Sequence, residues 1–115
     1  MSWGSVGSKS APAAAVRPEL RIHPEAAEEY EAARAWYETE SPKLGMEFEA
    51  ELGQIIERIL ESPGAGSPAP GGFRRRRVLR FPYTLVYRLI GNELWLMAFA
   101  HQSRKPHYWR ERRSP

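Results

Sequence analysis

The sequence contains no cysteine, so disulfide bonds and thiolate metal sites are excluded. It has no apolar run approaching the roughly 20 residues that a membrane-spanning helix requires. Residues 1–17 lack the continuous apolar stretch of about 7–15 residues that a signal peptide carries. Glycine-rich phosphate loops, nucleophile elbows and HExxH metal motifs are also absent. We therefore expect a cytoplasmic protein that uses no cofactor and no metal and that binds no membrane.

Acidic side chains are scarce in the second half of the chain. Residues 63–115 hold 11 Lys and Arg against 2 Glu, a balance of +9, whereas residues 1–62 hold 6 against 12, a balance of −6. A basic half of this kind indicates an anionic partner, either nucleic acid or an acidic protein. A solvated surface without a partner would give the same composition.

A chain of 115 residues is long enough for one domain with one hydrophobic core. Residues 1–17 are small and aperiodic, and we expect them to form a flexible tail. The remaining residues, 18–112, are predicted to form a single domain. Its first element is a short strand over residues 19–23, which Pro24 ends because proline is tolerated at the start of a helix.

Two helices are predicted next, over residues 24–40 and 42–61. Ser41-Pro42 ends the first and supplies the N-cap and first residue of the second. The short connection predicts an antiparallel hairpin, and Gly45 and Gly53 are expected to allow close approach of the first helix. Apolar side chains recur at helical spacing in both helices: Ala26, Tyr30, Ala33 and Tyr37 in the first, and Leu44, Phe48, Leu52, Ile55, Ile56, Ile59 and Leu60 in the second.

Residues 62–72 are rich in proline and glycine and are predicted to form a loop without regular structure. Three strands follow over residues 74–80, 83–90 and 93–101, with Gly91-Asn92 as a two-residue hairpin turn. The predicted fold class is therefore α+β in the order β-α-α-β-β-β. The helical hairpin is expected to pack on one face of a largely antiparallel sheet.

The two-residue turn determines which strand residues share a face. One face is wholly apolar or aromatic and is assigned to the helices. The other is mixed, and Arg88 lies opposite Trp95 in a geometry that suits cation–π contact. We predict that this second face is an open binding surface; alternatively its aromatic residues belong to the core and are covered. The first face holds Tyr83, Leu85, Tyr87, Leu89, Leu94, Leu96, Ala98 and Ala100, and the second holds Val86, Arg88, Trp95, Met97, Phe99 and His101.

Four consecutive arginines, Arg74–Arg77, lie on the first of the three strands. On a strand only two of them can point to either side. One register places Arg75 and Arg77 on the face of Arg88, and a slip of one residue places the other two there instead. The planar guanidinium group favours recognition of phosphate or carboxylate. The alternative is that the charge protects an edge strand from aggregation.

His101, Arg104, His107 and Tyr108 follow one another at the end of the last strand. Together with strand arginines they could cleave RNA without a metal, one group taking the 2′-hydroxyl proton and another protonating the leaving 5′-oxygen. Histidine titrates near neutral pH and suits either role. Alternatively His101 holds the C-terminal residues locally, and Tyr108 and Trp109 plug the sheet. No acidic partner lies at metal-ligand spacing, so a metal site is not expected.

The order of elements and several segments between residues 21 and 112 resemble the RelE/ParE superfamily of bacterial toxins, and ParE-like members of the plasmid stabilisation type in particular. The segments are HPEAAEEYEAARAWYE, SPKLGMEFEAELGQIIERILESP, RRRRVLRFPYTLVYRL and AFAHQSRKPHYW. The resemblance implies the toxin of a type II toxin–antitoxin module. It also implies a cognate antitoxin as partner, with which the toxin forms a hetero-oligomer.

The resemblance is compatible with two targets. ParE-like members poison DNA gyrase without enzymatic chemistry, and the long helices and the FPY and HxxRxPxYW patterns favour them. RelE-like members are ribosome-dependent endoribonucleases that cut mRNA, and this reading makes Arg77, Arg88, His101 and Tyr108 the catalytic candidates. An inactive toxin-fold binding module is a third reading. An acidic, apolar antitoxin segment would suit the second face, whose candidate binding residues are Arg75, Arg77, Arg88, Trp95, Met97, Phe99, His101 and Arg104.

Overall fold

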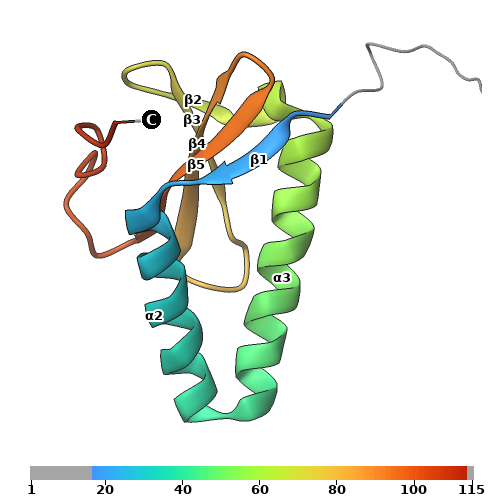
Figure 1. The fold of residues 1–115 in the computed structure, drawn as a ribbon. Helices are drawn as coiled ribbons and strands as arrows, with labels where there is room; N and C mark the ends of the chain where they lie inside the picture. The colour runs from blue at the N-terminus through green and yellow to red at the C-terminus, as the bar shows by residue number, and fades with distance from the viewer. Residues whose placement is uncertain (1–16, 114–115) are drawn as a thin grey trace, which may run out of the picture.

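The computed structural model describes residues 17–113, so the expected N-terminal tail lies, apart from Arg17, outside the described residues. Helices α2 (Pro24–Glu40) and α3 (Pro42–Glu61) form a hairpin against one face of a sheet (Figure 1). The sheet has five strands in the order β1-β5-β4-β3-β2, and only the β1–β5 pair is parallel. The predicted α+β class with the hairpin on one face is confirmed. The strands are β1 (Glu19–Ile22), β2 (Ser67–Ala69), β3 (Phe73–Arg77), β4 (Tyr83–Ile90) and β5 (Glu93–His101), with a 3₁₀ turn η1 (Pro63–Ala65) before β2.

The turn between the helices depends on one residue, as predicted. The Ser41 hydroxyl accepts a backbone hydrogen bond from the first turn of α3 at 3.3 Å, and the Ser41 N–H donates to the Tyr37 carbonyl at 3.0 Å. At Gly45 an added Cβ would lie 3.0 Å from the Cβ of Glu38, so glycine permits the predicted close approach. The same expectation for Gly53 is wrong, because an added Cβ there meets nothing within 4 Å. None of the helices within residues 17–113 has the length and apolar character needed to cross a membrane.

The main hydrophobic core lies between the hairpin and the sheet. Phe48 is fully buried at its centre, and its ring contacts those of Tyr30, Tyr37, Phe81 and Phe99 at centroid distances of 4.9–5.8 Å. Both predicted helical stripes face this core. Each fully buried large apolar side chain contributes about 1.5–3 kcal/mol, so the core fixes the hairpin on this face. The buried members of the core are Ala33, Phe48, Leu52, Ile55, Ile59, Leu60, Val78, Phe81, Leu85, Tyr87, Leu94, Leu96 and Phe99.

A β-bulge interrupts the pairing of β4 with β5. Near the Gly91-Asn92 turn the predicted register is confirmed, and Arg88 lies opposite Trp95. The register then shifts between Val86 and Tyr87, so that Val86 lies opposite Ala98. The extra residue in β5 exchanges the faces of all later side chains of that strand.

The bulge therefore corrects the predicted faces. Phe99 lies in the helix-side core, whereas Ala98 belongs to the cluster on the opposite face. His101 lies opposite Tyr83, and the two rings meet edge to face at 5.0 Å. The prediction that Phe99 and His101 share the face of Arg88 is wrong, because it assumed an unbroken ladder.

The prediction of a structureless loop over residues 62–72 is also wrong, because that segment contains η1 and β2. Pro68 lies on β2 at the edge of the sheet, where a missing backbone N–H leaves no ladder bond unmade. Arg74 donates to the Gly66 carbonyl at 2.7 Å, and the Tyr87 hydroxyl donates to the Pro63 carbonyl at 2.9 Å. These two bonds from β3 and β4 hold the segment against the sheet.

Candidate functional site: the sheet face and the C-terminal segment

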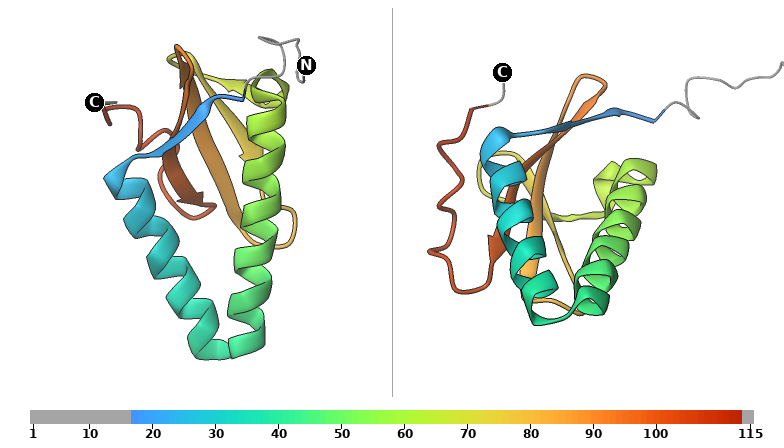
Figure 2. Two further views of the ribbon diagram at one scale, coloured as in Figure 1. Left: turned by 45° about the vertical axis from the view of Figure 1, so that its right-hand side comes forward. Right: turned by 60° about the horizontal axis from the view of Figure 1, so that its bottom comes forward.

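The sheet face opposite the hairpin is covered by the chain's own C-terminal segment, residues 102–113. Figure 2 shows this segment in red beside α2, on the side away from α3. Trp109 is 3% exposed and meets the ring of Phe73 at 4.9 Å, above Trp95 and Met97. Met97 is fully buried and Trp95 is 8% exposed. The prediction of an open apolar surface at these two residues is wrong, and the alternative that the C-terminal aromatics plug the sheet describes the structure.

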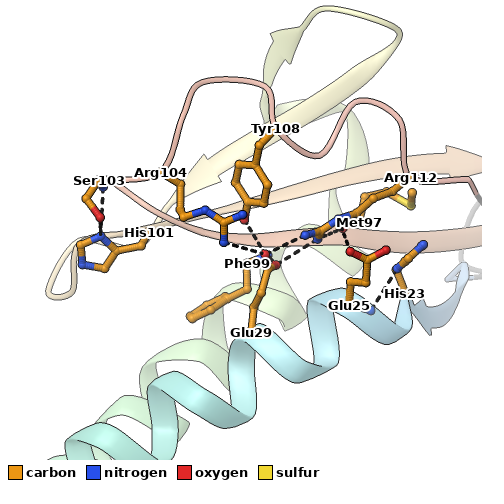
Figure 3. Close-up of polar contacts among 10 residues, drawn as sticks. All are labelled: His23, Glu25, Glu29, Met97, Phe99, His101, Ser103, Arg104, Tyr108 and Arg112. Carbon is orange, nitrogen blue, oxygen red and sulfur yellow. Dashed lines mark hydrogen bonds and ion pairs between the residues drawn. The ribbon is translucent and has the colours of Figure 1, made fainter.

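A carboxylate on α2 holds the C-terminal segment in place (Figure 3). Glu29 accepts hydrogen bonds from the Tyr108 hydroxyl at 2.6 Å and from the Arg112 guanidinium at 2.8 and 3.0 Å. The Arg104 guanidinium lies 3.6 Å from the same carboxylate and 3.8 Å from the centre of the Tyr108 ring. We call Glu29, Arg104, Tyr108 and Arg112 the Glu29 cluster.

The Glu29 cluster also satisfies the edge of the sheet. β1 pairs with β5 only as far as Leu96, so within residues 17–113 the rest of this edge has no neighbouring strand. Glu29 accepts a hydrogen bond from the Phe99 backbone N–H at 2.9 Å, and Arg112 donates to the Met97 carbonyl at 2.9 Å. Side chains thus replace the missing strand, since buried backbone groups require partners.

The electrostatics of the cluster favour an ionised Glu29 and a neutral Tyr108. Burial raises the pKa of Glu29, but hydrogen bonds from Arg112, Tyr108 and the Phe99 N–H outweigh burial and bring the pKa below its ordinary value. Burial and the neighbouring Glu29 carboxylate raise the pKa of Tyr108. The Tyr108 hydroxyl is therefore a hydrogen-bond donor held by Glu29, which does not suit it to act as a general base near neutral pH.

The predicted arginines lie on two sides of the sheet. Arg75 is paired with Val86 and Arg77 with Thr84, so both share the face of Arg88. This pairing settles the register that the sequence left open. Arg88 makes its cation–π contact with a different partner from the one predicted: its guanidinium lies 4.7 Å from the centre of the Phe73 ring and donates to a loop carbonyl at 3.0 Å.

The four candidate ribonuclease residues are not brought together. His101 lies opposite Tyr83 at one end of β4, and Arg88 is five residues further along that strand. At about 3.4 Å per residue this separates the two positions by roughly 17 Å. Tyr108 is bound to Glu29, as described above. One nitrogen of the His101 ring is also engaged, because Nδ1 accepts a hydrogen bond from the Ser103 backbone N–H at 3.0 Å.

A different group of basic side chains meets beside His101. A cavity of about 200 Å³ between the C-terminal segment and β4 is lined by Arg75, His101, Arg104, Lys105 and His107, among others. The sequence had suggested the proximity of the two histidines, because both follow the last strand. It had also placed Arg75 among the candidate binding residues with His101 and Arg104, but under only one of two registers, and the pairing of β3 with β4 was needed to choose that register.

The chain matches the family described as "ParE toxin of type II toxin-antitoxin system, parDE" over residues 20–106. The protein belongs to the ParE toxin family. Among solved structures, one titled "Chromosomal ParDE TA system from P. aeruginosa" is similar, with a TM-score of 0.66 and 19% sequence identity over 74% of this chain and 96% of that chain. At that identity the likeness shows the fold. No curated protein matches the chain.

Two members of the Glu29 cluster in this ParE-family protein, Glu29 and Arg112, were missed by the sequence reasoning. Glu29 lies three residues after Ala26 and four before Ala33, on the buried stripe of α2, and this position was the only available signal. Arg112 gave no signal, because it is one of several C-terminal basic residues and lies 83 positions from its partner. Tyr108 and Arg112 both lie beyond residue 106, where the family match ends.

Proposed function

We propose that this ParE-family protein is the toxin of a type II toxin–antitoxin module and arrests growth by binding DNA gyrase, without enzymatic chemistry, in the cytoplasm. The observation that favours gyrase over mRNA is the dispersal of the predicted ribonuclease residues. Arg88 and His101 lie towards opposite ends of β4, and the Tyr108 hydroxyl is bound to Glu29. General acid–base catalysis requires groups within hydrogen-bond reach of one substrate, and these residues do not provide them.

The proposed partner is a cognate antitoxin that forms a hetero-oligomer with the toxin. A similar solved structure is titled as a ParDE toxin–antitoxin system, which supports such a partner. Among the predicted binding residues, Arg75, Arg77 and Arg104 are exposed, whereas Trp95 and Met97 are buried. We therefore expect the antitoxin to recognise arginines first, with Trp95 and Met97 accessible only if the C-terminal segment is displaced.

Controlled expression in bacteria tests this proposal. The chain should stop growth while ribosome-bound mRNA stays intact, and co-expression of the antitoxin should restore growth. A variant carrying both Arg88→Gln and His101→Ala should remain toxic, because neither residue has a catalytic role in this account. Cleaved mRNA with the native chain and intact mRNA with the variant would contradict the proposal. Unchanged growth at high expression would instead indicate a binding module without toxicity.

A second candidate function is metal-independent cleavage of RNA in the cavity beside His101. It is favoured by one observation, the meeting of His101 and His107 with Arg75, Arg104 and Lys105 in that cavity. Two histidines could serve as general acid and general base, and the cations could stabilise the charge of the phosphorane. In this case a His107→Asn variant should abolish mRNA cleavage and toxicity together, whereas gyrase poisoning predicts that toxicity persists in that variant.

A further inference from the structure

A cavity of about 510 Å³ lies between α2 and the ends of β4 and β5. This volume falls in the range of about 300–1,000 Å³ that is typical of sites for small molecules. Most of its lining side chains are apolar or aromatic, and they are joined by two basic side chains, His101 and Arg104, and by the Glu29 carboxylate. Such a lining, with a few charged groups among aromatic ones, is also typical of small-molecule sites. We call this site the α2–β5 pocket.

The wall formed by α2 contains a recess beside an accessible ring. Ala32 and Ala33 lie between Glu29 and Trp36 along the helix face that lines the pocket, and their side chains are single methyl groups. Trp36 is 59% exposed, so part of its indole surface is accessible to a ligand. Its ring meets that of Tyr37 edge to face at 5.1 Å, which fixes its orientation. A planar ring therefore suits this wall.

The opposite wall is formed by stacked rings at the ends of two strands. The rings of Tyr83 and Phe99 stack at a centroid distance of 4.4 Å, and the Tyr83 ring meets that of His101 edge to face at 5.0 Å. The Arg104 backbone N–H donates to the His101 carbonyl at 3.0 Å, so the chain turns directly after β5 and brings both side chains to this wall. The wall is thus preformed, which lowers the entropic cost of binding.

Arg104 has an ionic partner but no hydrogen-bond acceptor (Figure 3). The Glu29 carboxylate already accepts four hydrogen bonds, from the Phe99 N–H, from Tyr108 and twice from Arg112, and these occupy its lone pairs. The Arg104 guanidinium lies 3.6 Å from that carboxylate, beyond hydrogen-bond distance, and its side chain donates no hydrogen bond within residues 17–113. Because it stacks on the Tyr108 ring at 3.8 Å and is half exposed, it presents a fixed fork of N–H donors.

We propose that the α2–β5 pocket binds a small aromatic monocarboxylate, a planar ring that carries one carboxylate group. The ring lies over the alanine recess between Trp36 and Tyr83, and the carboxylate accepts two hydrogen bonds from the Arg104 fork. His101 supplies a further donor. Its Nδ1 accepts the Ser103 N–H, so the neutral ring carries its proton on Nε2, and within the described residues nothing accepts from that N–H.

The charges around the pocket favour a carboxylate over a phosphate. A phosphate monoester carries a charge of about −1.5 to −2 at pH 7, whereas a carboxylate carries a single negative charge. The Glu29 carboxylate lies just beyond Arg104 and repels any additional negative charge. The planar guanidinium fork also matches the two oxygens of a carboxylate. The inference is independent of toxicity and of gyrase.

Isothermal titration calorimetry with the purified full chain tests the proposal. The probe is indole-3-acetate, an aromatic monocarboxylate, and we expect saturable binding with one ligand per chain. Indole-3-acetamide has nearly the same shape without the charge and should bind about tenfold or more weakly, since a charge-assisted contact is lost. Cyclohexylacetate keeps the charge without the aromatic ring and should bind several-fold more weakly.

Variants at exposed positions connect the binding to the pocket. Arg104→Gln should weaken binding of indole-3-acetate about tenfold or more, and Arg104→Lys, which keeps the charge but loses the planar fork, should weaken it several-fold. Ala32→Leu fills the recess and should also weaken it about tenfold or more. Ala35→Leu, the same change at an exposed alanine of α2 outside the pocket, and Arg110→Gln, at an exposed arginine outside it, should leave the affinity within about twofold.

Four results would overturn the proposal. The first is equal binding of indole-3-acetate and its amide, and the second is unchanged affinity in both Arg104→Gln and Ala32→Leu. The third is the absence of detectable binding at millimolar concentrations of the probe. The fourth is tighter binding of a different class of ligand: adenosine monophosphate would assign the pocket to nucleotides, and N-acetyl-Gly-Gly-Phe with a free carboxylate would assign it to the C-terminus of a protein.

Discussion

Replacing Glu29 with alanine removes the carboxylate that holds the C-terminal segment against the sheet. Three hydrogen bonds to Tyr108 and Arg112 and one to the Phe99 backbone are lost together. Arg112, whose side chain is 9% exposed, would keep only the Glu25 carboxylate at 3.5 Å and the Met97 carbonyl at 2.9 Å as partners. Removing the nearer and more buried carboxylate from a nearly buried charge is strongly unfavourable.

Two independent estimates give the magnitude. Removing one partner of a buried ion pair costs about 3–5 kcal/mol. The segment can avoid that cost by detaching, but detachment exposes Trp109 and uncovers Met97. Burial of each of these two side chains is worth about 1.5–3 kcal/mol. The segment stays docked if losing Glu29 costs less than exposing Trp109 and Met97, and it detaches if losing Glu29 costs more. We therefore expect Glu29→Ala to destabilise the docked state by about 3 kcal/mol.

Equilibrium unfolding in urea and hydrogen exchange measure this effect together. Glu29→Ala should lower the free energy of unfolding, or abolish the protection of amides 104–112 while the helices remain protected. Glu28→Ala is the matched control, because Glu28 is an exposed glutamate on the same helix, with no ion pair within the described residues, and its replacement should change stability by less than about 0.5 kcal/mol. A loss below about 1 kcal/mol with normal protection of the segment would refute the reasoning, since Trp109 alone would then hold it.

Three further predictions concern the same contacts and the helical hairpin. The pKa of Glu29 in the folded protein lies below its ordinary value of 4.5. The ionised carboxylate therefore stabilises the fold fully above pH 4.5, and this stabilisation is lost as the pH falls through the lower folded-state pKa. An acid titration monitored by tryptophan fluorescence should show this loss for the native chain, and the Glu29→Ala variant should not show it. Tyr108→Phe keeps the ring but removes the hydroxyl donor, and urea unfolding should show a loss of about 1.5–3 kcal/mol. Gly45→Ala should destabilise by about 1–3 kcal/mol because its Cβ would lie 3.0 Å from that of Glu38, whereas Gly53→Ala should stabilise by up to about 1 kcal/mol, as differential scanning calorimetry of the pair would reveal.

The regular elements were predictable because their signals are local. Helical spacing of apolar residues, the Ser41-Pro42 cap and the Gly91-Asn92 turn each depend on neighbours in sequence, and the helices and the last two strands lie where these signals place them. The bulge near Met97 left no comparable signal, since it becomes visible only once β4 and β5 are paired. The wrong face predicted for Phe99 follows from this single extra residue in β5.

The contacts of the candidate site depend on long-range packing and were less predictable. Arg75 and Arg77 were correctly grouped with Arg88 under one of two registers, but the pairing of β3 with β4 was needed to choose it. The bond between Glu29 and Arg112 joins residues 83 positions apart, and no periodic pattern links them. In the sequence, two charged residues that pair only in the folded protein are visible as composition, and nothing marks them as partners.

The central claim, a ParE-family toxin that acts on gyrase without catalysis, is tested most directly by a supercoiling assay with purified components. DNA gyrase, relaxed plasmid and ATP are mixed with increasing amounts of the full chain, and supercoiled and cleaved DNA are separated on a gel. The account predicts that supercoiling stops, or that linear DNA accumulates, with the native chain and equally with the Arg88→Gln, His101→Ala variant. Undiminished supercoiling at saturating protein, together with cleavage of ribosome-bound mRNA by the same preparation, would contradict it.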